Sequence, residues 1–278
     1  MRLTRRGRLA VTLSLVLLAG ALATYAVRSS SLGNALGLGG GPDCVLESGE
    51  TRQEWSTDEA MTATTVAGVG TRIGATVNGV AAAVSRAMES EQETALGPEG
   101  AREIYRRLPE VARPGAEAVQ LAELLLGHRG GVLSCTVPLT DEVGLAREDA
   151  GEVGLTPRAD ALRVAMREVF GKQILGGYEP AGVDSGHVEG SAHYEGRAID
   201  VFFRPISEAN QRLGWQQAVW AVAHADDLAV ATVIFDREIW TAGRSVQGWR
   251  TYRYPGGETD NPVLLHEDHV HVDVAEGG

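Results

Sequence analysis

The sequence predicts an α+β protein whose C-terminal part is built on a largely antiparallel sheet. Two patterns support this fold class. From about Ser56 to Leu126, apolar residues recur every three to four positions, which indicates helices. From Thr156 onward, helical segments and short apolar runs follow one another without a regular βαβ order. With 278 residues, 44% of them hydrophobic, the chain can bury a core in more than one folded unit.

The N-terminus has the pattern of a membrane-targeting segment. The basic stretch "MRLTRRGR" precedes an uncharged apolar run from Leu9 to Val27, long enough to span a bilayer as a helix. The arginines are expected to stay in the cytoplasm, so the chain after Arg28 is expected outside. The small residues "ALA" at 21–23 resemble a signal-peptidase site. Residues 1–28 are therefore predicted to be a signal anchor or a signal peptide, and the protein either a single-pass membrane protein or a secreted one.

Composition divides the remaining chain into four segments. Residues 29–43 are rich in Ser and Gly and are predicted to be a flexible linker. A small all-helical domain is predicted over 44–135, with Pro109 and Pro114 separating its helices. Residues 136–154 form a polar linker, and 155–278 form the α+β domain.

The expected elements of the last segment follow from local signals. Thr156 and Pro157 form a helix start, and the helix is expected to run to Gly171. Another helix is expected to begin near Ser207. Strands are predicted over 198–203, 228–236 and 270–274, where short apolar runs are bounded by turn residues.

Charge and cysteine usage narrow the function. The net charge is −12, and without the five arginines of residues 1–28 it is −17, which argues against nucleic acid as a partner. Cys44 and Cys135 are the two cysteines, and neither has a second thiol at metal-ligand spacing. Outside the cytoplasm they are expected to form a disulfide; two free buried thiols are the alternative.

Four of the seven histidines fall in two short stretches, "SAHYEGRAID" (191–200) and "LLHEDHVHVDV" (264–274). On a strand, His269 and His271 share one face because side chains alternate. Gly196 offers a bend that can bring His193 and Asp200 together. Two imidazoles and one carboxylate with an open fourth position form the ligand set of a catalytic zinc site.

These stretches resemble the motifs of a known group. "SAHYEGRAID" matches S-x-H-x-x-G-x-A-x-D, and "HVH" matches the later H-x-H, of the zinc peptidases that include D-Ala-D-Ala carboxypeptidases, VanX- and VanY-type enzymes and MepA-like murein endopeptidases. The resemblance covers about residues 155–275. It implies a zinc-peptidase-like α+β domain, Zn²⁺ as cofactor, and peptidoglycan peptides as substrate.

The resemblance also implies roles for individual residues. His193, Asp200 and His271 would be the zinc ligands. Asp268, three positions before His271, would be the base, and His269 and His266 would stabilise the oxyanion or carry a proton. Ser191 would brace the first ligand loop. From the residues alone, Asp268 is equally a solvated acid, His266 a loop residue, and Asp273 either a partner of an imidazole or a surface carboxylate.

One position departs from the pattern. Members of this group often carry Tyr-Arg upstream of the first histidine, where the arginine holds a substrate carboxylate; here Glu179 follows Tyr178. An anion at that place would repel a free C-terminal carboxylate. Arg197, Arg237 or Arg244 is a candidate substitute.

Residues 50–126 show a second resemblance, to a worn lysozyme-like helical segment of actinobacterial exported proteins. Glu89-Ser90 would stand at the catalytic Glu-Ser, but the downstream G-L-x-Q type stretch is missing. A helical spacer or wall-binding domain is the resulting interpretation, since a lone carboxylate lacks the partner that glycosidases use.

Two functions follow as hypotheses. The first is an extracytoplasmic zinc peptidase, a D,D-carboxypeptidase or endopeptidase, that cuts stem peptides or cross-links of the cell wall. The second is a catalytically inactive, peptidase-derived binding or regulatory module. The complete ligand set and the carboxylate at 268 favour the enzyme. A serine D,D-peptidase is excluded because Lys172, the one lysine, has Val169 where S-x-x-K needs serine.

Overall fold

The computed structural model describes residues 43–278 except 50, 90–95, 109–111, 129 and 139–143. The predicted membrane segment (1–28) and nearly all of the linker 29–43 lie outside the described residues. Within the described part, no helix is both long and apolar enough to cross a bilayer. Residues Asp43–Gly278 group into one compact unit, and the predicted division at 136–154 stays a prediction.

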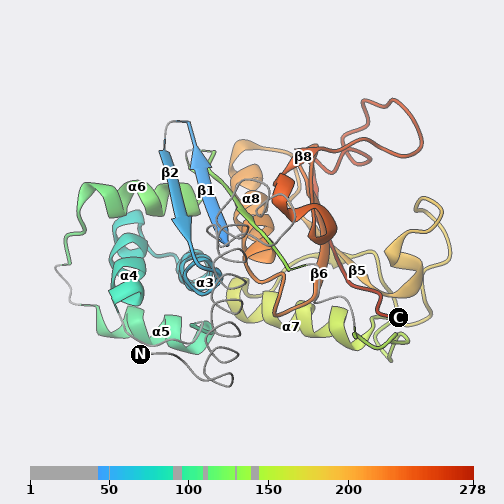
Figure 1. Cartoon of the computed structure of the whole chain (residues 1–278), viewed down its shortest axis with the longest axis horizontal. Helices are drawn as coiled ribbons and strands as arrows, with labels where there is room; N and C mark the ends of the chain where they lie inside the picture. Colours follow the sequence, from blue (N-terminus) through green and yellow to red (C-terminus); the bar gives the residue numbers. More distant parts are fainter. Residues whose placement is uncertain (1–42, 50, 90–95, 109–111, 129, 139–143) are drawn as a thin grey trace, which may run out of the picture. The chain divides into compact units, whose positions relative to one another are not determined.

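Four helices form the first part of the described chain: α3 (Thr57–Ile73), α4 (Val77–Glu89), α5 (Pro98–Arg107) and α6 (Ala116–Leu125) (Figure 1). Helix α3 begins with a capping box, in which Ser56 and Glu59 satisfy each other's backbone amides. It ends at Gly74, whose φ of 70° is in the left-handed region. Every residue from Ala60 to Gly70 is buried, so α3 is the central helix of this part.

A three-stranded antiparallel sheet accompanies these helices. It consists of β1 (Cys44–Ser48), β2 (Thr51–Trp55) and β3 (Val132–Cys135) in the order β2-β1-β3. The prediction of an all-helical domain over 44–135 is therefore wrong at both of its ends. The strands have only four or five residues, and β3 pairs with β1 from far along the chain, so no local window signals the sheet.

The predicted disulfide is present in the structure. Cys44 and Cys135 are direct cross-strand partners on β1 and β3, and their sulfur atoms are bonded. Both residues are buried in the core. The bond closes a chain segment with a sequence separation of 91 residues, and so ties the two ends of the helical part together.

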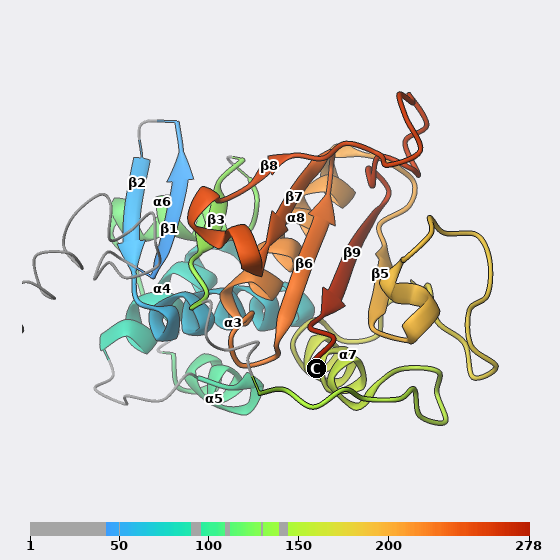
Figure 2. The same cartoon turned by 45° about the vertical axis from the view of Figure 1, so that its right-hand side comes forward.

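The C-terminal part holds a six-stranded antiparallel sheet in the order β4-β5-β9-β6-β7-β8 (Figure 2). The strands are β4 (Leu175–Gly176), β5 (Ala198–Phe202), β6 (Val230–Phe235), β7 (Glu238–Thr241), β8 (Arg250–Thr251) and β9 (His269–Val274). Two 3₁₀ helices, η1 (Ala192–Glu195) and η2 (Ala242–Gln247), connect to it. The mixed α+β class with antiparallel pairing is confirmed.

Two helices cover one face of this sheet. Helix α7 (Pro157–Phe170) starts at the Thr156 cap, and α8 (Glu208–Ala223) starts at the Ser207 cap, both as predicted. Valines 270, 272 and 274 of β9 are fully buried on the helix side. Gly214 of α8 lies against the Phe235 ring of β6, so closely that a Cβ at 214 would lie 2.1 Å from it. The opposite face of β5, β9 and β6 is left for the site.

Candidate metal centre

The candidate site is built on the open face of β5 and β9. The two strands pair antiparallel, with Asp200 opposite His271 and Phe202 opposite His269. Because side chains alternate along a strand, all four point to the same face, away from α8. The sheet register thus brings together two motifs separated by about 70 residues.

His193 reaches the same place from the 3₁₀ helix η1. Ser191 caps this helix and accepts a hydrogen bond from the backbone amide of His193, the bracing role that the sequence suggested. Gly196 ends it with a φ of 66°, and a Cβ there would lie 2.6 Å from the Gly154 carbonyl oxygen. The short helix, Gly196 and β5 together fold the segment 191–200 so that His193 turns back toward Asp200.

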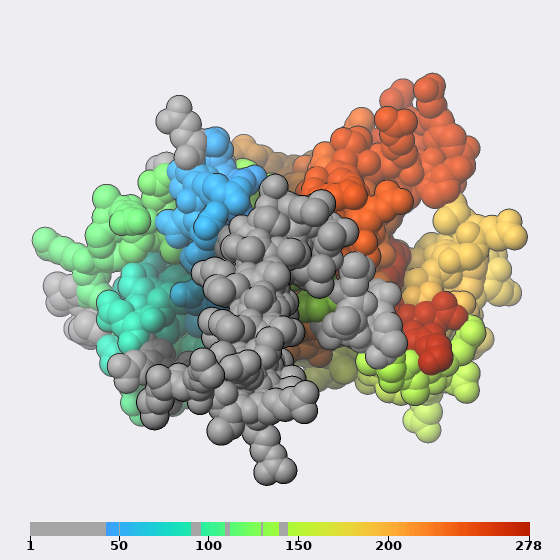
Figure 3. Space-filling model, in the orientation of Figure 1, coloured from blue at the N-terminus to red at the C-terminus, as the bar shows by residue number. Residues whose placement is uncertain are grey.

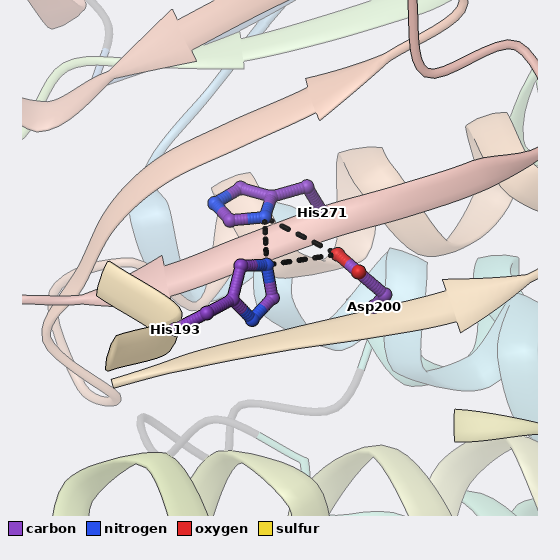
Figure 4. Close-up of side chains that lie close together, drawn as sticks. All are labelled: His193, Asp200 and His271. Carbon is purple, nitrogen blue, oxygen red and sulfur yellow. Dashed lines mark hydrogen bonds and ion pairs between the residues drawn. The ribbon is translucent and has the colours of Figure 1, made fainter. Parts of the chain in front are cut away.

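The three predicted ligands come together with spacings suited to one metal ion (Figure 4). His193 Nε2 lies 3.1 Å from His271 Nδ1, and each of these atoms lies 3.3 Å from Asp200 Oδ1. Tetrahedral ligands at zinc distances would lie about 3.3–3.5 Å from one another. All three residues are buried, and their donor atoms can hold a metal ion.

Hydrogen bonds behind the ligands aim their lone pairs at the common point. The Nδ1–H of His193 donates to the Gly177 carbonyl at 2.7 Å, which leaves Nε2 as the lone-pair nitrogen. The Nε2–H of His271 donates to Asp273 Oδ2 at 3.2 Å, which leaves Nδ1 for a metal. Such partners fix the tautomer and raise the basicity of metal-binding imidazoles. Asp273 thus takes the partner role rather than that of a free surface acid.

The buried charges depend on one another. Burial alone would raise the pKa of Asp200, but its close polar contacts with His193 and His271 outweigh burial and lower that pKa far below its usual value. Burial alone would lower the pKa of His271, but hydrogen bonds to Asp200 and Asp273 and their charges raise it to about 9. In the metal-free protein, a proton on His271 therefore balances the carboxylates.

A second group lies beside the three ligands. His269 donates its Nδ1–H to Asp268 Oδ1 at 2.7 Å, and its Nε2 lies 3.8 Å from Asp200 Oδ1. The other oxygen of Asp268, Oδ2, accepts from Arg204 Nε at 2.5 Å. Both carboxylate oxygens of Asp268 are thus occupied by protein partners. The lone pair of His269 Nε2, in contrast, faces the ligand group.

His266 completes the group of predicted residues. Its φ of 56° is in the left-handed region, and its ring lies 4.7 Å from that of His269 and 4.9 Å from that of Tyr252. Burial, and then the neighbouring His271 and His269, lower the pKa of His266 to about 2. Its Nδ1 is buried and has no hydrogen-bond partner among the described residues. His266 is a neutral imidazole with an unused polar atom.

These residues lie in a cleft of about 820 Å³. One wall is formed by residues of the 186–193 segment, among them His187 and Ser191, and the other by residues of the 252–266 segment, among them Tyr252, Tyr254 and His266; residues of β5, β9 and β6 form the floor. Figure 3 shows the molecule hollowed between these two segments, coloured yellow and orange-red.

Part of the chain matches a known protein family. Residues 151–263 match the family model described as VldE, C-terminal domain. No curated protein and no solved structure matches the chain. The VldE C-terminal-domain match covers less than half of the 278 residues. It includes His193 and Asp200 but ends before His266, so the second histidine stretch lies beyond it.

Within the segment similar to the VldE C-terminal domain, two site residues were missed by sequence reasoning. His187 is not among the predicted site residues, yet its ring stacks on that of His193 with centroids 3.9 Å apart, and it lines the cleft. Arg204 is the second, and it comes two residues after Phe202, the last residue of β5, in the sequence series Asp200, Phe202, Arg204. The every-second-residue spacing of 200, 202 and 204 could have predicted Arg204 as a site residue. His187 is part of no such periodic pattern.

The same VldE-similar segment contains Glu179, which the sequence placed near the substrate. Glu179 is exposed and is not among the described residues that line the cleft. Its charge therefore has no close access to a ligand on the cleft floor. Of the remaining histidines, His224 bonds to Thr65 and Trp220 in the contact between α8 and α3, away from the cleft.

Proposed function

We propose that this chain is an extracytoplasmic zinc-dependent peptidase that cleaves peptidoglycan stem peptides or cross-links. One observation carries the proposal: three buried donors, His193, Asp200 and His271, lie 3.1–3.3 Å apart at the floor of an open cleft, beside a histidine whose lone pair faces them. A site that served structure alone would have its donors closed off from solvent by further ligands.

The donor set fits zinc better than it fits calcium or magnesium. Two imidazole nitrogens and one carboxylate oxygen are typical of catalytic zinc, whereas calcium and magnesium take mainly oxygen ligands. The hydrogen bonds from His193 to Gly177 and from His271 to Asp273 match the support that zinc-binding imidazoles have. Bound there, zinc supplies Lewis acidity toward a peptide carbonyl and an attacking water.

The chain's own residues supply the proton transfers. His269 is suited to accept a proton through Nε2, because Asp268 holds its Nδ1–H and so keeps the lone pair directed at the reacting groups. In this assignment Asp268 orients His269 rather than contacting water itself. Asp268 as the direct base remains the second option, and the two differ in the variants discussed below.

His266 is suited to bind the oxygen of the attacked carbonyl. It is a neutral imidazole, because burial lowers its pKa to about 2, and it lines the cleft beside His269. A fixed donor at the position where negative charge develops lowers the barrier of acyl transfer. His187, stacked on His193, covers the ligand group from the other wall.

The expected location agrees with this substrate. The basic flank and apolar run of residues 1–28 predict export or anchoring in the cytoplasmic membrane. The Cys44–Cys135 disulfide is typical of an oxidising compartment. Peptidoglycan lies outside the cytoplasmic membrane, so the protein would meet it directly.

The experiment that tests the proposal follows bond cleavage and metal content together. The purified protein is incubated with peptidoglycan and defined muropeptides, with and without a chelator, and products are identified by mass spectrometry. Loss of terminal D-alanine or of a cross-link, sensitive to the chelator and absent in His271→Ala, supports the peptidase. A protein that binds zinc stoichiometrically but yields no product would instead be the wall-binding or regulatory module.

A further inference from the structure

Arg204 has a position in the cleft that the proposed catalysis does not use. It lies two residues beyond Phe202, the last residue of β5, and its Cζ lies 4.2 Å from the centroid of the Phe202 ring. It lines the same cleft as the three metal donors. A cation stacked on an aromatic ring at a cleft floor is held in one orientation.

The hydrogen bonding of Arg204 leaves part of its guanidinium free. Nε donates a hydrogen bond to Asp268 Oδ2, and this bond holds one edge of the guanidinium in place. The two terminal NH₂ groups have no hydrogen-bond partner among the described residues, and the side chain is 51% exposed. Their planar pair of donors matches the two oxygens of a carboxylate.

The other arginines near the cleft are unsuited to this role. Arg197 also lines the cleft, but its guanidinium already donates to Glu195 and to the Val274 carbonyl, and its side chain is 15% exposed. Arg237 pairs through Nε with Glu267 and does not line the cleft. Arg244 is likewise absent from the described lining.

We propose that Arg204 binds a carboxylate of the substrate about two residue lengths from the cleaved bond. The guanidinium lies over Phe202, two residues and about 7 Å along the strand from Asp200, a distance that two extended peptide residues span. The carboxylate belongs either to the end of the substrate chain or to an acidic side chain. This inference rests on the proposed peptidase function, since it concerns the same cleft.

The test compares two matched variants of the full chain, Arg204→Gln and Arg237→Gln. Both arginines are about half exposed and anchor through Nε on neighbouring acids, Asp268 and Glu267, but only Arg204 lines the described cleft. Thermal unfolding checks that both variants fold. Binding is measured by titration calorimetry with three N-acetylated D-alanyl-D-alanine peptides: the free acid, the C-terminal amide, and an amide with a glutamate side chain.

The native protein is expected to bind one of the two acids about 10- to 100-fold more tightly than the plain amide. Which acid it prefers identifies the source of the carboxylate. This preference should vanish in Arg204→Gln and persist in Arg237→Gln. Equal affinity for all three peptides in the native protein, or a preference that survives in Arg204→Gln, overturns the inference.

Hydrolysis of the same peptides separates this inference from the proposed function. Chelator-sensitive cleavage without any acid preference leaves the peptidase intact and removes the role of Arg204. An acid preference that depends on Arg204 without cleavage supports the carboxylate site in a binding module. Because Arg204 also holds Asp268, its loss can slow catalysis indirectly, so the acid-to-amide ratio within each variant is the deciding quantity.

Discussion

Asp200 and His271 are direct cross-strand partners on β5 and β9, and Asp200 Oδ1 lies 3.3 Å from His271 Nδ1. The contact joins the two histidine-containing stretches at the middle of the sheet. Because β5 and β9 are internal strands with buried valines and isoleucine on their helix side, the backbone beneath the pair is rigid. A metal bound by this pair and His193 would find its ligands already in position.

Removing a donor should abolish metal binding, whereas removing its neighbour should not. His271→Ala is expected to lower zinc affinity by more than about 100-fold, since even outer partners of zinc ligands contribute 10- to 100-fold. His187→Ala is the matched control, because His187 stacks on His193 without being one of the three donors. Metal content after dialysis and chelator competition give both values. Loss of zinc in both variants to the same extent would contradict the assignment of ligands.

Metal affinity should increase with pH. The raised pKa of His271, about 9, means that the metal-free site holds a proton at pH 7. Zinc must displace this proton, so affinity is expected to rise by up to about tenfold per pH unit as pH increases toward about 9, and to level off above it. Asp273→Asn removes one interaction that raises this pKa and should flatten the dependence. Competition titrations with a zinc indicator measure the slope, and an unchanged slope would show that Asp273 does not control the proton.

The disulfide should contribute a large part of the stability of the helical part. Cys44 and Cys135 are buried partners across a sequence separation of 91 residues. Replacing both by serine is expected to lower the free energy of unfolding by about 2–5 kcal/mol. Denaturant unfolding of the native protein and of the double variant measures the difference, and thiol alkylation before and after reduction verifies the bond. Equal stability of the two proteins would contradict the expectation.

Acid should destabilise the fold through His224. Burial lowers its pKa to about 4, against about 6.5 in an unfolded chain. As pH falls from 6.5 to 4, the unfolded state therefore takes up the proton first, and the free energy of unfolding decreases. The ring keeps some exposure, so the expected loss is about 1–2 kcal/mol. His224→Gln cannot titrate, so denaturant unfolding at pH 7 and pH 4.5 should show a smaller decrease for this variant.

The sequence predicts the helices, strands and turns that carry the site residues, but it does not predict how β5 and β9 pair. Each of the two motifs is short, and capping residues such as Thr156, Ser191 and Ser207 mark where elements begin. The pairing of Asp200 with His271 joins strands 71 residues apart, and alternation alone leaves such a register open. The sequence therefore supplied the donors, whereas the distances between them come from the sheet.

The residues that sequence reasoning missed have weaker local signals. The pairing of β1 with β3 depends on contacts across most of the helical part, so the strands at the two ends of 44–135 have no local signal in the sequence. His187 lies in a loop with glycines at 186 and 190, where no period applies. The free donors of Arg204 become evident only when Asp268 is seen to occupy its Nε.

The roles of His269 and Asp268 can be separated by a double-variant experiment. Asp268 Oδ1 accepts from His269 Nδ1, and its Oδ2 accepts from Arg204, so Asp268 has no oxygen directed at the ligand group without a protein partner. His269→Gln is therefore expected to reduce hydrolysis by about 10²- to 10⁴-fold. Asp268→Asn should cost less, because the asparagine oxygen can still accept from Nδ1–H.

Rates of muropeptide hydrolysis are compared for the two single variants and the double variant, with zinc content as the control for site integrity. If His269 is the base and Asp268 orients it, the double variant should be no slower than His269→Gln, because residues that act as one unit are not additive. If Asp268 is the base, Asp268→Asn should be the slower single variant. That order, with zinc retained in both proteins, would transfer the role of base from His269 to Asp268.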